Sequence, residues 1–127
     1  MKRISITHMS NAHNDWLRAL DFYKQEIVVL KKRLGEVADK NTLPEVLKQV
    51  EHFENQFAIQ EENIDILCHD IHVNLTDITK EIQQSKEGYI SERLFTVHDS
   101  LGQKFADEEK IFNGIRHEFN QFSGAWM

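Results

Sequence analysis

The residues best suited to chemistry lie in one short stretch of the sequence, DILCHDIH, at residues 65–72. It carries two acids, two imidazoles and the only cysteine of the chain. Carboxylates, imidazoles and thiolates are the groups that bind transition metals and act in acid–base or nucleophilic catalysis. On a helix, the spacing of Asp65, Cys68, His69 and His72 places all four on one side. The stretch is therefore either a metal or catalytic site or the polar flank of a helix.

The polar-flank interpretation follows from the apolar residues of the same segment. If Leu67, Ile71 and Leu75 point to a core, the polar side of residues 65–72 lies about 110° away from them around the helix axis. Cys68 is nearest the boundary, and we expect it to be half buried because cysteine packs as a small apolar group. Nearby acids oppose a reactive thiolate there, so nothing supports a catalytic cysteine.

A metal site is the alternative, because residues from other segments reach the same level. Counting outward from turns near residues 41 and 87 puts His13 level with His69, and Glu108 about one turn away. Helical bundles bind divalent transition metals through inward histidine and carboxylate side chains. No histidine has an acid three residues before it, which is the spacing of ferritin-like di-iron bundles. The candidate ligands for a divalent transition metal are His13, Asp65, His69, His72 and Glu108.

Three long amphipathic segments must position these residues. In the first, apolar residues from Trp16 to Val37 alternate at spacings of four and three, the heptad pattern of a packed helix. The second and third segments repeat this pattern, and the connections between them are short. We therefore expect an all-α fold, an antiparallel up-down-up bundle with coiled-coil-like seams. The expected helices span about 11–39, 43–85 and 89–123.

Length and composition define the class of protein. The chain has 127 residues, and we expect one domain over 1–127, with 1–10 as an extended or loosely ordered N-terminal segment. The formal net charge of −6 argues against a nucleic-acid-binding protein, whose phosphate contacts need a basic face. A single cysteine excludes an internal disulfide and favours a reducing compartment. No apolar run approaches the roughly 20 residues of a membrane span, so we expect a cytoplasmic protein.

The predicted helices differ in length, and this difference leaves part of the hairpin uncovered. At 1.5 Å per residue the second helix reaches about 60 Å and the first about 45 Å, so about 15 Å lacks a neighbour. An exposed apolar strip of that size usually contacts a partner. Either residues 1–10 cover it or a second copy does, and we expect a homodimer; docking to a different protein is the alternative. The strip consists of Ile71, Leu75, Ile78, Ile82, Ile90, Leu94 and Val97.

Other residues interrupt or supplement the apolar stripes. A buried, unpaired carboxylate costs several kcal/mol, so we expect Glu108 to reach outward, with Lys104 as its partner four residues earlier. Polar seam residues also fix the register and the number of helices. One carboxylate without a nucleophile or base makes no mechanism, and we assign no catalytic residue.

Apolar residues off the seams indicate a second packing face: Phe22, Val29, Ile59 and Ile66.

Two segments resemble small helical bacterial proteins of no assigned activity. They are HNDWLRALDFYKQEI, residues 13–27, and VEHFENQFAIQEENID, residues 50–65. The likeness rests on packing and surface positions, and it implies a stand-alone helical bundle and no substrate. The sequence thus predicts a non-catalytic interaction or structural protein that self-associates through its apolar strip, with a metal-binding bundle as the alternative.

Overall fold

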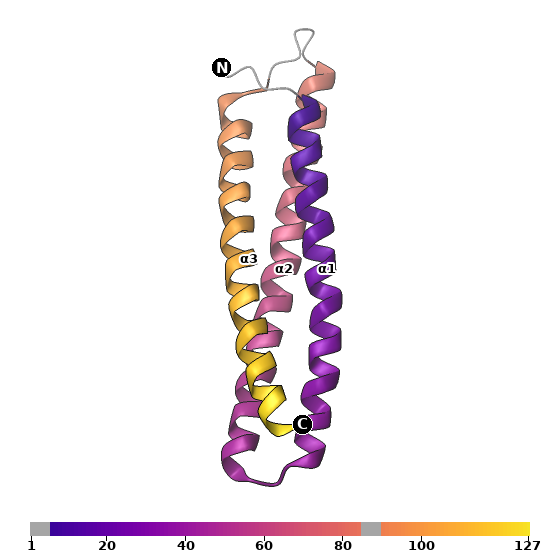
Figure 1. Ribbon diagram of the computed structural model, residues 1–127. Helices are drawn as coiled ribbons and strands as arrows, with labels where there is room; N and C mark the ends of the chain where they lie inside the picture. The colour runs from indigo at the N-terminus through magenta and orange to yellow at the C-terminus, as the bar shows by residue number, and fades with distance from the viewer. Residues whose placement is uncertain (1–5, 85–89) are drawn as a thin grey trace.

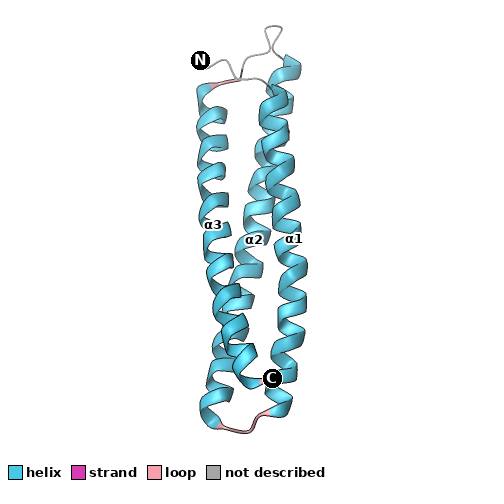
Figure 2. Ribbon diagram, in the orientation of Figure 1, coloured by secondary structure: helices cyan, strands magenta, loops and turns pink. Residues whose placement is uncertain are grey.

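The computed structural model describes residues 6–84 and 90–127, which form three long helices packed side by side (Figure 1). Successive helices run in opposite directions, and Figure 2 shows a single short loop between the first two. The predicted all-α, up-down-up bundle is confirmed, and the described residues contain no strand. None of the helices in this part of the chain has the apolar length needed to cross a membrane. The helices are α1 (Ile6–Lys40), α2 (Pro44–Gln84) and α3 (Glu92–Trp126).

Local sequence explains where two of the helices start. Pro44 opens α2 at a position where a missing backbone N–H needs no acceptor. The carbonyl of Leu43 accepts hydrogen bonds from the next free N–H groups, those of Val46 and Leu47, at 3.0 and 3.1 Å. At the start of α3, the Ser91 hydroxyl accepts from the Leu94 N–H at 3.3 Å, as an N-cap residue does.

The heptad-spaced apolar residues form the core, with one change of position on α2. On α1, the predicted stripe from Leu20 to Val37 is buried. On α2, the predicted stripe continues from Ile71 to Leu75, but the structure buries Asn74 and leaves Leu75 half buried. The spacing of four and three therefore continues through an asparagine. Burial of this asparagine is possible because its side chain has a polar partner on α1.

The first helix starts earlier than the sequence predicted. Residues 6–10 are helical rather than extended, and α1 begins at Ile6 instead of residue 11. Met9 is buried against Ile78, Ile90 and Leu94, and this burial favours the extra helical turns. The apolar pattern of the sequence did not indicate these turns, because a histidine, His13, occupies the core position between Met9 and Trp16. Residues 1–5 and the predicted turn at 85–88 lie outside the described residues.

The longer α1 covers most of the strip that we expected to be exposed. With 35 residues against the 41 of α2, α1 falls short by only about 9 Å. The prediction that the strip faces solvent is wrong for four of its seven residues, because the first turns of α1 and the α2–α3 contact enclose them. Within the chain, Ile71, Ile78, Ile90 and Leu94 are buried, Leu75 and Ile82 are half buried, and Val97 is exposed.

Candidate functional site

The stretch at residues 65–72 is the polar flank of α2. Asp65 is exposed, and its carboxylate forms an ion pair with Lys24 of α1 at 2.5 Å. Cys68 is half buried, as predicted. Burial, reinforced by the charge of Asp65, raises the pKa of the Cys68 thiol, so the unreactive thiol form is favoured. The stretch therefore joins α2 to α1 and does not form a nucleophilic site.

The five candidate metal ligands do not come together. Only His13 and Glu108 point into the bundle, His13 beside Asn74 and Glu108 beside Gln60. Asn74 and Gln60 are fourteen residues apart on α2, which separates the two sites by about 21 Å along the axis. The other three candidates face solvent on the α2 flank. Across residues 6–84 and 90–127, no group of three or more His, Cys, Asp and Glu side chains is arranged to hold a metal.

His13 instead links all three helices through a buried chain of hydrogen bonds. Its Nδ1 donates to the carbonyl of Met9 at 2.7 Å, and its Nε2 lies 2.9 Å from Oδ1 of Asn74. The Asn74 amide nitrogen donates in turn to the carbonyl of Leu94 on α3 at 3.5 Å. An amide offers both an oxygen and an N–H group, so the Asn74 side chain contacts α1 and α3 at the same time.

We expect Asn74→Leu to lower the free energy of unfolding by about 1 to 3 kcal/mol. Leucine has nearly the shape of asparagine but leaves Nε2 of His13 buried without a partner. Urea denaturation followed by circular dichroism measures the change. The exposed Asn120 of α3 is the matched control, and Asn120→Leu should shift stability by less than about 0.5 kcal/mol. Equal effects of the two substitutions would contradict the buried hydrogen bond.

His98 packs beside this chain as an aromatic ring. Its centroid lies 4.8 Å from that of His13 and 5.0 Å from that of Trp16. Its buried Nδ1 has no hydrogen-bond partner among residues 6–84 and 90–127. Burial lowers the pKa of His98, and His13 lowers it further, so the folded protein favours the neutral ring. A group with a lowered folded pKa stabilises the fold above its ordinary pKa of 6.5 and less as the pH falls.

Glu108 is the second buried polar site, and its position corrects the sequence prediction. We expected Glu108 to reach outward to Lys104, but it is only 6% exposed, and none of the ion pairs in the described chain joins these two residues. Burial raises the pKa of Glu108 from 4.5 to about 7. With its nitrogen turned toward Glu108, Gln60 donates to both carboxylate oxygens, at 3.0 Å to Oε1. With its oxygen turned inward, Gln60 accepts from the protonated carboxyl, so the pair suits either state.

A groove between α2 and α3 opens beside Glu108. It holds a pocket of about 220 Å³ whose apolar walls include Ile66 and Ile111. Asp70, Lys104 and Asp107 also line this pocket. The lining combines apolar and charged side chains, which suits the binding of an amphipathic surface.

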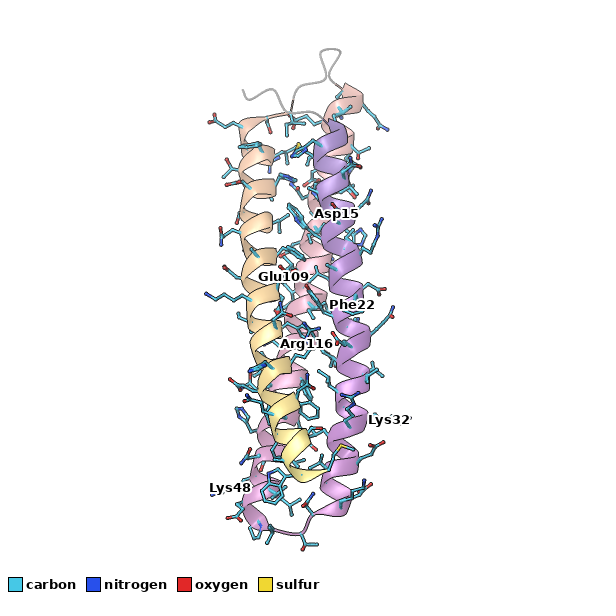
Figure 3. All side chains as sticks on the ribbon, viewed as in Figure 1. Asp15, Phe22, Lys32, Lys48, Glu109 and Arg116 are labelled. Atoms are coloured by element: carbon cyan, nitrogen blue, oxygen red, sulfur yellow. The ribbon has the colours of Figure 1, made fainter. Side chains whose placement is uncertain are left out.

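Polar side-chain contacts cross the two grooves that border α1. Figure 3 shows Glu109 and Arg116 on α3 on the side that faces α1. The Tyr23 hydroxyl donates to Glu109, and burial together with this hydrogen bond raises the pKa of Tyr23 to about 12. The contacts are Lys24–Asp65 at 2.5 Å and Lys31–Glu61 at 2.6 Å between α1 and α2, and Glu26–Arg116 at 2.7 Å and Tyr23–Glu109 at 2.5 Å between α1 and α3.

The third groove, between α2 and α3, differs in its surface contacts. Within the described chain, no ion pair crosses it. Five large apolar side chains beside it are 38 to 53% exposed and recur at intervals of seven on α2 and fourteen on α3. The sequence pattern places two of them off the seams, and only one of the five belongs to the predicted interface strip. We name this surface the α2–α3 face; it consists of Ile59, Ile66, Val73, Val97 and Ile111.

The two buried polar sites and the α2–α3 face differ in their exposure to solvent. Neither buried polar site pairs a nucleophile with a base, and both are largely satisfied within the chain. The α2–α3 face, in contrast, presents apolar side chains to solvent. Comparison of the chain with protein-family models, with curated proteins and with solved structures found no match.

Proposed function

We propose that this protein is a non-catalytic interaction or structural module of the cytoplasm that self-associates into a homodimer through its α2–α3 face. The observation that supports the proposal is the difference between the three grooves. Ion pairs and a tyrosine hydrogen bond cross the two grooves along α1, whereas the third groove exposes five branched apolar side chains at heptad spacing. Apolar side chains gathered in this way mark a protein–protein contact.

The energetics favour a partner that covers the whole face. Completing the burial of a half-exposed valine or isoleucine contributes roughly 1 kcal/mol. A homodimer buries each side chain twice, which doubles the contribution. Association costs on the order of 4 to 15 kcal/mol in lost freedom, so the side chains of the face must act together. Of the residues that the sequence predicted for the interface, only Val97 belongs to this surface.

We expect size-exclusion chromatography with light scattering to give about twice the chain mass of 15.0 kDa. Ile66→Glu should give a monomer that keeps its helical content, because residue 66 is exposed and its substitution leaves the core intact. Val28→Glu is the matched control, since Val28 is exposed on α1 outside the face, and this variant should stay dimeric. A monomeric wild-type protein throughout the micromolar range would overturn the proposal.

A further inference from the structure

Two contacts across the α2–α3 groove show which residues of the two helices are level. Gln60 meets Glu108, and the Asn74 side chain meets the backbone of Leu94. Because α2 and α3 are antiparallel, one residue forward on α2 corresponds to one residue back on α3 (Figure 1). Residue 73 is therefore level with residue 95, and residue 59 with residue 109. The apolar residues of the face thus form two matched rows, one on each helix.

Apolar side chains of the two rows lie almost opposite each other. Val73 on α2 is within two residues of the level of Val97 on α3, or about 3 Å along the axis. Ile59 has the same offset from Ile111. Between these pairs, Ile66 lies close to the level of Lys104, whose aliphatic stem can cover an apolar neighbour.

The charged residues beside the face follow the same register with opposite signs. Asp77 of α2 lies within two residues of the level of Arg93 on α3, and both line the same groove. Near the other end, Lys48 of α2 is within two residues of the level of Glu118 on α3. Figure 3 shows Lys48 on the side of α2 away from α1. The row on α2 is therefore complementary to the row on α3.

Within the part of the chain that the structure describes, these charges form no ion pair. None of the ion pairs within residues 6–84 and 90–127 involves Asp77, Arg93 or Lys104. The ion pairs present all hold α1 to its neighbours. An occupant of the face can therefore form new pairs without breaking existing ones.

We infer that, in the proposed homodimer on which this inference rests, α2 of each copy packs against α3 of the other around a two-fold axis parallel to the helices. This arrangement places Val73 against the partner's Val97 and Ile59 against the partner's Ile111. It also places Asp77 beside the partner's Arg93. The four helices form an antiparallel bundle in which every α2 has an α3 on each side.

The charges disfavour the other way of pairing the two faces. A two-fold axis perpendicular to the helices stacks α2 on α2 and α3 on α3. The two copies of Lys104 then lie near the axis and close to each other, and like charges opposed at an interface cost association free energy. In the parallel-axis dimer, Lys104 faces the partner's α2, which carries Asp70 one turn from Ile66.

Cysteine cross-linking between differently labelled chains distinguishes the two arrangements. In full-length chains carrying Cys68→Ser, we expect a mixture of Val73→Cys and Val97→Cys chains to form a covalent dimer on oxidation. Each of these variants alone, and Ile66→Cys alone, should not cross-link, because identical positions lie diagonally across the four-helix bundle, beyond disulfide reach. The product is read on a non-reducing gel.

The outcomes separate this inference from the proposed function. A dimeric mass by light scattering with cross-linking of Ile66→Cys alone shows the perpendicular axis and overturns only the inference. A dimeric mass with no cross-link in any sample overturns the inference and also the α2–α3 face as the contact of the proposed homodimer, because the contact then lies on another face. A monomeric mass for the wild-type chain overturns both.

Charge reversal gives an independent readout of the same contact. Asp77→Arg and Arg93→Asp should each weaken the dimer roughly three- to tenfold in dissociation constant, as expected for an exposed ion pair. The chain that carries both substitutions should recover most of the affinity, since the pair is restored with its signs exchanged. Additive losses in the double variant contradict the inferred contact.

Discussion

Phe119→Ala is expected to lower the free energy of unfolding by about 3 to 5 kcal/mol. The Phe119 ring is fully buried, and its centroid lies 5.3 Å from those of Phe53 and Phe57 and 6.4 Å from that of Phe122. Alanine removes these aromatic contacts together with the hydrophobic burial of the ring. The remaining rings sit on two long, continuous helices that can collapse into the space only in part, so a cavity persists.

Urea denaturation at a fixed protein concentration measures this loss. Phe22→Ala is the matched control, because Phe22 is 56% exposed on α1 and contacts only the ring of Tyr23 among the aromatic residues. We expect the control to change stability by less than about 0.5 kcal/mol. A loss below about 1 kcal/mol for Phe119→Ala would show that α2 and α3 are not packed through this aromatic cluster.

Glu108→Gln should remove a pH-dependent part of the stability worth roughly 2 to 3 kcal/mol. The folded pKa of about 7 lies above the ordinary value of 4.5, so the folded protein binds this proton more tightly. The corresponding stability is fully present below about pH 4.5 and is lost as the pH rises through about 7. Wild-type protein should therefore lose more stability between about pH 5 and about pH 8 than the variant does. Hydrogen bonds from Gln60 to the ionised carboxylate reduce the size of the effect.

The comparison isolates Glu108 from the other titrating groups. The lowered pKa of His98 acts in the opposite direction, but it acts equally in both proteins and cancels in their difference. Glu54→Gln, an exposed substitution on α2, should leave the wild-type pH dependence unchanged. Identical pH dependence of wild type and Glu108→Gln would mean that the Glu108 carboxyl is solvated in the folded protein.

Much of the fold and part of the candidate site could be predicted from local pattern. A helical residue's direction depends on its spacing from its apolar neighbours, and this holds wherever the pattern is unbroken. The stripe from Leu20 to Val37 was therefore assigned to the core correctly. The same rule placed Asp65 on a solvated flank and left Cys68 half buried, which is what the structure shows.

Spacing alone could not predict whether polar residues on the buried stripes point into the bundle or out to solvent. Whether Glu108 turns outward or stays inside depends on Gln60, which belongs to a different helix. Where α1 begins depends on burial of Met9 against α2 and α3. Both outcomes need the packed bundle, because the stabilising groups come from distant parts of the chain.

The chain by itself therefore determined three amphipathic helices, their order and the direction of most side chains. Tertiary structure alone decided that His13 and Asn74, 61 residues apart, satisfy each other, which extends the buried region to the start of α1. That extension covers most of the strip expected to be free, whereas the apolar side chains of the α2–α3 face stay exposed. The physical reason is that hydrophobic periodicity describes each helix separately, whereas the surface that becomes buried depends on how the helices pack against one another.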